Sequence, residues 1–278
     1  MHKRRKCLTD SPLKVLVTGA SRGMGRATAL LLAESGYRVY AASRRPEELR
    51  ELHDRLVPLY VDLRDPRSVR DLLAGTGTVD VLVNNAGYGL VSTVEELDEA
   101  QMREQFEINL FGVLRMCREV IPGMRRQGSG VIVNISSFLG KIGLPLLTCY
   151  NASKYAVEGI TDSLRYELRP FGIRVHSVMP GFFDTCFARS NLVVNPATVA
   201  SESPYAPLAG HLAPKIVAQI NNGDDPQEVA RIIAEIIEDP DSPARRAAGE
   251  KARYFIPMRR ELEDEDFEER VRDYYGLE

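Results

Sequence analysis

The stretch KVLVTGASRGMG, from Lys14 to Gly25, predicts a buried strand that turns directly into a helix. An apolar run at 15–17 precedes the glycines, and helical spacing follows from 23 to 35. Glycines at such a junction let backbone N–H groups approach a phosphate, which the helix dipole also favours. The spacing is TGxxxGxG, wider than GxGxxG. It predicts a nucleotide site, although glycine turns also arise for structural reasons alone. The residues expected in this site are Gly19, Ser21, Arg22, Gly23, Met24 and Gly25.

Further apolar runs rich in β-branched residues alternate with helical patterns along the chain. They predict strands at 39–42, 59–61, 81–83, 131–133 and 175–179. Short apolar runs of this kind suit strands buried on both faces of a sheet. Helical segments between them indicate right-handed crossovers. The sequence therefore predicts a single-domain α/β fold, with a doubly wound parallel sheet flanked by helices.

The rhythm of the pattern breaks after Gly181. Residues 182–224 mix Pro, Ser and Asn with apolar residues and form an extension, after which a helix at 227–237 and a further strand at 253–256 are predicted. We assign residues 13–257 to the domain. The basic segment 1–12 is expected to be a disordered tail, and the acidic segment 258–278 a solvated helix or loose tail.

Composition excludes several classes of protein. A length of 278 residues fits one large α/β domain, and a net charge of −3 offers no electrostatic basis for binding nucleic acid. No apolar stretch reaches the roughly 20 residues of a membrane span, and none follows the basic start as in a signal peptide. Scattered cysteines without CxxC pairs or suitably spaced histidines argue against a metal site. They fit a reducing compartment, so a cytoplasmic location is expected.

The end of the second strand indicates the type of cofactor. A carboxylate there would bind the adenosine ribose of NAD. Instead the sequence has Ser43, Arg44 and Arg45, with Arg22 expected nearby. Arginine forms charge-assisted hydrogen bonds to a 2′-phosphate, which a carboxylate would repel, so NADP(H) is the predicted cofactor. The alternative is that Arg44 and Arg45 only solvate a surface loop.

Two further strand ends complete the predicted cofactor site. Asp62 and Leu63 follow the third strand, where a carboxylate could accept a hydrogen bond from the adenine amino group or could equally cap a turn. Asn85, Ala86 and Gly87 follow the fourth strand. Small residues there would let the cofactor ribose lie against the backbone, although Asn-Asn-Ala-Gly is also an ordinary turn sequence.

Tyr150 and Lys154 are four residues apart, which places them on one face of a helix. A free phenol has a pKa near 10 and is a poor base at neutral pH. A neighbouring ammonium is expected to lower that pKa by stabilising the phenolate. The pair then suits proton exchange with an alcohol or carbonyl while a nicotinamide exchanges a hydride. As an isolated pattern, YxxxK is more often a pair of surface neighbours.

Taken together, these motifs resemble the short-chain dehydrogenase/reductase family over residues 14–256. In family order they are Thr18–Gly25, Asn84–Gly87, Asn109, Ser137, Tyr150 with Lys154, and Pro180-Gly181. The resemblance implies a Rossmann fold and an NADP-dependent alcohol dehydrogenase or carbonyl reductase. It also implies association into homodimers or homotetramers through the helices that carry Asn109 and Tyr150.

The resemblance also implies a role for each motif residue. Ser137 would hold the substrate oxygen, with Ser136 as the alternative. Asn109 would join a water-mediated proton relay with Lys154, or be a buried structural residue. Thr185 would hold the nicotinamide carboxamide, and Pro180, Gly181 and Phe183 would lie against the cofactor.

Substrate choice in this family depends largely on the segment after Pro180-Gly181, which is rich in apolar residues here. Apolar lining predicts a lipophilic substrate, although these residues could instead pack against the core or a subunit. Leu144, Cys149, Phe182 and Phe187 are the predicted substrate contacts. The stretch YNASKYAVEGITDSLRYELRPFG, residues 150–172, is similar to the 17β-hydroxysteroid type 1 and retinol dehydrogenase branch. This similarity implies a steroid-like, retinoid-like or other lipophilic carbonyl substrate, either a ketone or an aldehyde.

Two other functions remain open from the sequence. The chain could reduce 3-oxoacyl thioesters, in which case arginines near the pocket mouth would receive an acidic carrier. Candidates for that patch are Arg115, Arg118, Arg125 and Arg126. It could also be a non-catalytic NADP(H)-binding redox sensor. The presence of all four catalytic residues that the resemblance implies argues against this interpretation; they are Asn109, Ser137, Tyr150 and Lys154.

Overall fold

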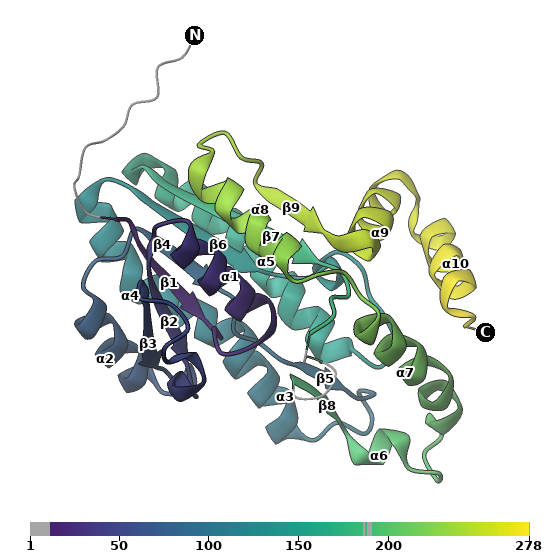
Figure 1. Ribbon diagram of the computed structural model, residues 1–278. Coiled ribbons are helices and arrows are strands. Elements are labelled where there is room, and N and C mark those ends of the chain that lie inside the picture. The colour runs from purple at the N-terminus through teal and green to yellow at the C-terminus, as the bar shows by residue number, and fades with distance from the viewer. Residues whose placement is uncertain (1–11, 186, 188–190, 278) are drawn as a thin grey trace.

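The computed structural model describes residues 12–185, 187 and 191–277, which form a three-layer α/β domain (Figure 1). Its described residues build a seven-stranded parallel sheet in the order β3-β2-β1-β4-β6-β7-β9. The order reverses direction between β1 and β4, which is where ligands bind in open parallel sheets. The strands are β1 (Lys14–Thr18), β2 (Arg38–Ser43), β3 (Leu56–Tyr60), β4 (Val81–Asn84), β6 (Gly130–Ile135), β7 (Ile173–Pro180) and β9 (Arg245–Ala248).

Helices cover both faces of this sheet. The helices α1 (Gly23–Glu34) and α8 (Gln227–Glu238) pack on the face turned to the viewer in Figure 1. The opposite face carries α2 (Pro66–Thr76), α4 (Gly112–Gln127) and α5 (Thr148–Leu168). The strands between the two layers are buried on both sides. Short 3₁₀ turns η1 (Pro46–Leu49), η3 (Phe138–Gly140) and η4 (Arg169–Phe171) connect these elements.

A π-helical segment joins two helices beside the carboxyl ends of the strands. It spans Glu107–Phe111, called η2, and links α3 (Glu99–Phe106) to α4 without a break. Such wider turns often occur at functional sites because they redirect a side chain. Here the redirected side chain is that of Asn109, which is 1% exposed.

The predicted strands and the predicted helix at 227–237 are confirmed, with small shifts of boundary. The third strand starts at Leu56, earlier than predicted, and ends before Val61. The strand predicted at 253–256 is wrong, because those residues lie inside the helix α9 (Gly249–Glu261). The last strand of the sheet is β9 instead. Its sequence RRAA contains no β-branched run, so apolar patterning did not reveal it.

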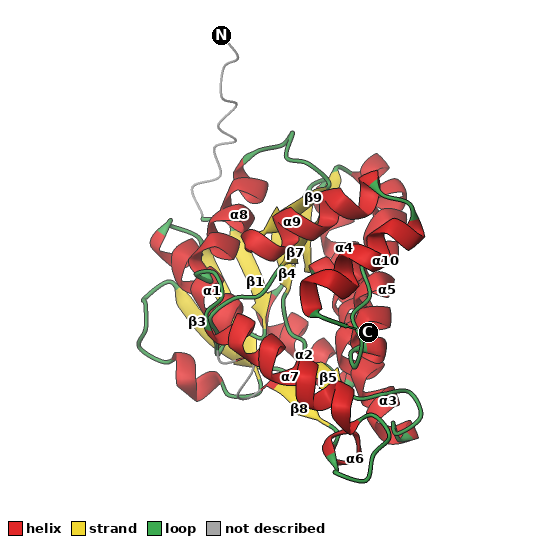
Figure 2. Cartoon of the chain, turned by 90° about the vertical axis from the view of Figure 1, so that its right-hand side faces the viewer, coloured by secondary structure: helices red, strands yellow, loops and turns green. Residues whose placement is uncertain are grey.

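The extension at 182–224 is partly regular structure. The short strand β8 (Leu192–Val194) pairs with β5 (Gly89–Val91), and the helices α6 (Pro196–Val199) and α7 (Ala206–Asn221) follow. Figure 2 shows β5, β8, α6 and α7 gathered at one end of the molecule. They lie beyond the carboxyl ends of the strands of the large sheet. They therefore form the outer wall of the region next to the point between β1 and β4 where the strand order reverses.

The C-terminal segment packs against the domain. The predicted domain end at 257 falls inside α9, and α10 (Asp264–Tyr275) follows it. The acidic residues of α10 face solvent, while Phe267, Val271 and Tyr275 join an apolar cluster with Phe255. The spacing of Phe267, Val271 and Tyr275 at every fourth residue is the sequence pattern that could have revealed this packing. Of the predicted N-terminal tail, residues 1–11 lie outside the described part of the chain.

Tyr275→Ala is expected to lower the free energy of unfolding by about 3 kcal/mol, because removing a buried aromatic ring leaves a cavity. Tyr275 is 1% exposed, and its ring stacks on Phe255 with centroids 6.1 Å apart. Urea denaturation measures the change. The control Tyr166→Ala, at a side chain that is 83% exposed, should shift stability by less than about 0.5 kcal/mol. Equal losses in both variants would show that α10 is not docked as described.

Candidate active site

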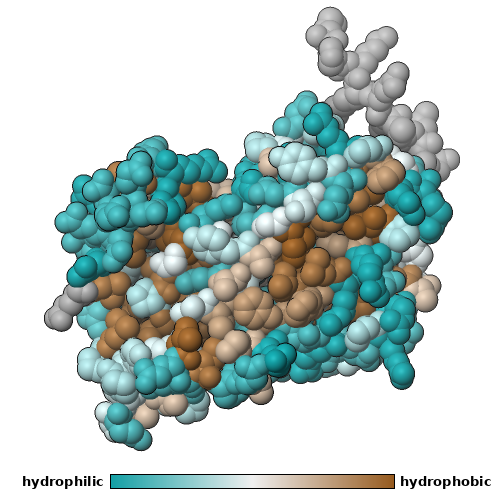
Figure 3. All heavy atoms as spheres, turned by 180° about the vertical axis from the view of Figure 1, so that it is seen from behind, coloured by the Kyte–Doolittle hydropathy of each residue, from teal (hydrophilic) through white to brown (hydrophobic). Residues whose placement is uncertain are grey.

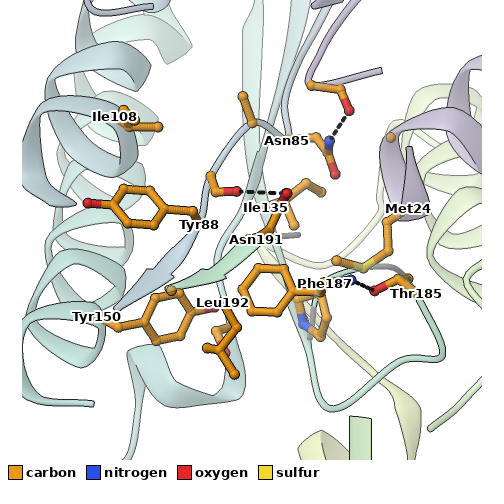
Figure 4. Close-up of a pocket in the computed structure, with 18 of the residues that line it drawn as sticks. Met24, Asn85, Tyr88, Ile108, Ile135, Tyr150, Thr185, Phe187, Asn191 and Leu192 are labelled. Carbon is orange, nitrogen blue, oxygen red and sulfur yellow. Dashed lines mark hydrogen bonds between the residues drawn. The ribbon is translucent and has the colours of Figure 1, made fainter. Parts of the chain in front are cut away.

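A cavity of about 410 Å³ opens at the carboxyl ends of the parallel strands, where the strand order reverses (Figure 4). Every residue predicted to contact the cofactor lines it, and Ser137 does so as well. They come from six strand ends and from α5, which the fold brings to one place. The lining includes Gly19, Ser21, Arg22, Gly23, Met24, Gly25, Ser43, Arg44, Asp62, Leu63, Asn85, Ala86, Gly87, Tyr150, Lys154, Pro180, Gly181, Phe183 and Thr185.

The glycine turn is held against the end of β4 by contacts that leave no room for side chains. Asn85 donates from Nδ2 to the carbonyl of Thr18 at 2.9 Å (Figure 4 shows its side chain facing the turn). A Cβ built on Gly25 would lie 2.3 Å from this Nδ2 and 2.4 Å from the Gly19 carbonyl oxygen. Gly19 itself has φ +66°, the left-handed conformation that favours glycine. The resulting narrow turn at the start of α1 fits a phosphate-bearing group.

The arginine end of the cavity contains a carboxylate that sequence reasoning missed. Glu48 in η1 accepts hydrogen bonds from Arg22 Nη2 at 2.8 Å and from Arg45 Nη1 at 3.3 Å. These arginines hold the pKa of Glu48 below its usual value. Glu48 belongs to an ordinary-looking surface sequence, Pro-Glu-Glu-Leu, which carries no signal of this role. The exposed Arg44 lies on the same part of the lining.

Asp62 caps the turn that follows β3, which is one of the two roles expected from the sequence; the other was to bind the adenine amino group. Its Oδ1 accepts from the backbone N–H of Arg64 at 3.0 Å, and the Arg64 guanidinium pairs with the carboxylate. Chiefly the Arg64 hydrogen bond lowers the pKa of Asp62. The carboxylate still lines the cavity, so the capping contact does not remove it from reach of an adenine.

Tyr150 and Lys154 share one face of α5 at the inner end of the cavity. Lys154 Nζ donates to the carbonyl oxygen of Ile135 at 2.9 Å and lies 5.8 Å from the centre of the Tyr150 ring. Ser137 is hydrogen-bonded to the Tyr150 phenol. Ser136, the alternative, turns its hydroxyl to the Lys154 carbonyl at 3.5 Å instead. The serine that faces the tyrosine is therefore Ser137.

The protonation of this pair differs from the sequence-based expectation. Burial raises the pKa of Tyr150 to about 12, although the hydrogen bond from Ser137 opposes the shift. Burial also lowers the pKa of Lys154 to about 8, opposed by the charge of Glu158. The expectation that Lys154 would depress the pKa of Tyr150 is wrong for this arrangement, because desolvation dominates. Tyr150 is a protonated phenol at neutral pH.

Asn109 lies behind the cavity wall and does not line it. Its Oδ1 accepts from the Tyr88 N–H at 3.0 Å, and its Nδ2 donates to the Tyr88 carbonyl at 2.9 Å and to Ser153 Oγ at 3.1 Å. A Cβ added to Gly87 would be 3.2 Å from Asn109 Oδ1 and 3.7 Å from Lys154 Nζ. Gly87 thus allows Asn109 and Lys154 to approach one another, while the proposed relay between them stays a prediction.

The predicted substrate residues divide into two groups. Phe182 and Phe187 line the cavity, and the Phe187 ring lies 6.5 Å from that of Tyr150 (Figure 4). Leu144 and Cys149 do not: Leu144 is 3% exposed in the apolar core, and Cys149 lies in the first turn of α5 outside the cavity lining. Further apolar wall residues, which sequence patterns did not reveal, come from β5, the segment before α5, and α7. They are Leu90, Leu139, Leu147, Ile216 and Ile220.

Among residues 12–185, 187 and 191–277, no three His, Cys, Asp or Glu side chains gather to hold a metal ion. The same part of the chain has no helix with the length and apolarity needed to cross a membrane.

The chain matches the family model described as short chain dehydrogenase over residues 13–192. It is 34% identical over 268 residues to a 3-ketodihydrosphingosine reductase of Bacteroides thetaiotaomicron, covering 96% of this chain and 99% of the relative.

Two solved structures are similar over most of the chain. A short-chain dehydrogenase from Streptomyces avermitilis has 34% identity and a TM-score of 0.81, with 97% of this chain and 100% of that one covered. One from Burkholderia cenocepacia, in complex with NADP, has 27% identity and a TM-score of 0.75, with 95% and 99% covered. The chain belongs to the short-chain dehydrogenase/reductase family of NAD(P)-dependent oxidoreductases.

Proposed function

We propose that this protein reduces a long-chain ketone to an alcohol, using NADPH as the hydride donor. The observation that carries the proposal is the grouping of Tyr150, Lys154 and Ser137 at the inner end of an apolar cavity, where burial raises the pKa of the Tyr150 phenol. A ketone reductase needs a proton donor at the carbonyl oxygen. Burial supplies one by keeping this phenol neutral.

Each residue of the site has a part in the proposed reaction. The bound cofactor supplies the hydride to the carbonyl carbon. The hydroxyls of Ser137 and Tyr150 hold the carbonyl oxygen, and Tyr150 transfers its proton to that oxygen as negative charge develops there. The Lys154 ammonium stabilises the phenolate left behind. Phe182 and Phe187 exclude water from this end of the cavity.

The same protonation state makes Tyr150 better suited to ketone reduction than to alcohol oxidation. Alcohol oxidation needs Tyr150 as a base, and a phenol with a pKa of about 12 is rarely ionised near neutral pH. Ketone reduction needs it as an acid, which is its resting form. The buried site therefore favours reduction at neutral pH.

The preference for NADP(H) rests on the charges at the end of β2. Arg22, Arg44 and Arg45 line that end of the cavity, and Ser43 stands where an NAD-binding carboxylate would be expected. Guanidinium groups suit a 2′-phosphate. The residues of the glycine turn and of the 85–87 turn would hold the pyrophosphate and ribose.

The proposed substrate is a lipophilic ketone with a straight chain. The apolar wall of the cavity supports a lipophilic group, and a relative that aligns with 96% of this chain is named 3-ketodihydrosphingosine reductase. The similarity to the steroid and retinol branch is not supported by that relative, so we propose no steroid or retinoid substrate. The carrier-binding alternative also lacks support, because Arg115 and Arg118 on α4 pair with Glu107 and Glu119 and do not line the cavity.

We also propose a homo-oligomer formed through η2, α4 and α5. These elements carry the exposed apolar side chains Phe111, Leu114 and Tyr155, respectively. Figure 3 shows apolar surface gathered on this side of the molecule, opposite to the view in Figure 1. Sedimentation equilibrium should show a dimer or tetramer, and Leu114→Glu should yield a monomer. A wild-type monomer at all accessible concentrations would contradict the proposal.

The free thiols of Cys117 and Cys149 fit the proposed cytoplasmic location.

The function is tested by NADPH oxidation with straight-chain ketones of increasing length, including a long-chain 2-amino-3-ketone. The ratio kcat/KM should rise with each methylene until the cavity is filled, because each buried methylene contributes about 0.8 kcal/mol. Tyr150→Phe should lower kcat by a factor of about 1,000 while changing the Kd for NADPH by less than about twofold. Tyr155→Phe, one turn further along α5, is the matched control.

Two outcomes would contradict this proposal. Tight NADPH binding with no turnover of any ketone would indicate a sensor. Substantial residual turnover by Tyr150→Phe would remove that residue as the proton donor.

The pH profile tests the state of Lys154. We expect kcat/KM for NADPH, which reports the free enzyme, to be constant at low pH and to fall as the pH rises through about 8. The ammonium is the charged form below its pKa, and its loss removes the group that binds cofactor and stabilises phenolate. Lys154→Arg keeps its charge and should abolish this decline. A wild-type profile that stays flat to pH 10 would disprove the assignment.

A further inference from the structure

Glu48 is a charged group in the cofactor region that the proposed mechanism does not use. It accepts from Arg22 Nε at 3.1 Å and from Arg22 Nη2 at 2.8 Å, a two-pronged pair. It also accepts from Arg45 at 3.3 Å. One carboxylate therefore bridges two of the three arginines that line the adenosine end of the cavity.

The position of this carboxylate is fixed by the fold. Glu48 lies in the 3₁₀ turn η1, which begins with Pro46 and places the next residue, Leu49, fully in the core. Glu48 itself is not part of the cavity lining, whereas Arg22 and Arg45 are. The carboxylate thus contacts both guanidinium groups at the edge of the cavity, while leaving the cavity open.

We propose that Glu48 is a counter-ion built into the 2′-phosphate site, which competes with that phosphate for Arg22 and Arg45 and so sets the selectivity between NADP(H) and NAD(H). This inference rests on the NADP(H) preference proposed above. A cofactor with a 2′-phosphate must share both arginines with Glu48 and bring its own negative charge close to the carboxylate. A cofactor without the phosphate leaves the ion pairs intact.

The consequence is a moderated preference for the phosphorylated cofactor. Arg44 also lines the cavity, directly follows Ser43 and has an exposed side chain. Its charge helps to lower the pKa of Asp62. The three guanidinium groups and the Glu48 carboxylate together carry about one positive charge fewer than the arginines alone. The attraction of this cluster for a phosphate is weaker to that extent. Because the groups are partly exposed, the effect is of the size of a screened surface interaction.

The test compares Glu48→Gln with wild type, using adenosine 2′,5′-bisphosphate and AMP as probes of the adenosine end alone. Glutamine keeps the shape and one acceptor oxygen, so Arg22 retains a hydrogen bond. The ratio of the Kd for AMP to the Kd for the bisphosphate should rise about fivefold at low salt. This gain should shrink as ionic strength increases. Isothermal titration calorimetry measures both values.

Glu47→Gln is the matched control. It removes the same charge from the neighbouring exposed residue while the ion pairs of Glu48 with Arg22 and Arg45 stay in place, and it should leave the ratio as in wild type. An unchanged or lower ratio in Glu48→Gln would overturn the proposal, since it would make Glu48 irrelevant or only an orienting group for the arginines.

Arg44→Ala separates this proposal from the one on which it rests. If Arg44→Ala weakens the bisphosphate but not AMP, while Glu48→Gln leaves the ratio unchanged, the role of Glu48 alone is rejected. If Arg44→Ala weakens both probes equally and wild type does not discriminate between them, the 2′-phosphate site itself is rejected, and the role of Glu48 with it.

Discussion

The buried ammonium of Lys154 is the interaction on which the active site depends. An ammonium removed from water must be compensated by hydrogen bonds or charge. Here the compensation is a 2.9 Å bond to the Ile135 carbonyl at the end of β6, supported by the charge of Glu158 one turn along α5. Gly87 leaves the space in which Lys154 and Asn109 come close. These contacts tie α5, β6 and the π-helical turn to one point, and the Tyr150 phenol is placed by the same helix face.

Burial gives this point its chemical character. It holds the Tyr150 proton in place and leaves Lys154 only moderately basic, so the resting site is an acid with a stabilising cation behind it. Burial causes both pKa shifts, and apolar residues from β5, α7 and the segment after Gly181 line the same cavity. The segment proposed as the substrate wall therefore also adjoins Tyr150, the proposed proton donor. Changes in that wall are expected to alter rate as well as specificity.

The parts of this arrangement that sequence patterns predicted are local ones. Apolar runs identified the strands, and the glycine turn, Ser137 and the Tyr150–Lys154 pair were found because each depends on residues close together in sequence. Patterns failed where a role arises from packing. The strand β9, with sequence RRAA, has no apolar signature, and Ile216 and Ile220 reach the cavity only because α7 folds over it. Cys149 adjoins Tyr150 in sequence, yet it does not line the cavity. Glu48 pairs with Arg22, which lies 26 residues away in sequence. The raised pKa of Tyr150 depends on how deeply the fold buries the phenol, which no local sequence pattern reveals.

The most direct test of the central claim follows the hydride and the proton together. Wild-type protein would be mixed in a single turnover with a long-chain ketone and NADPH carrying deuterium at the transferable position of C4. Mass spectrometry of the product should find one deuterium on the carbinol carbon. The turnover rate with the deuterated cofactor should be lower in heavy water than in ordinary water, because Tyr150 delivers a solvent-derived proton. An alcohol without deuterium, or no alcohol at all while the cofactor stays bound, would contradict the account.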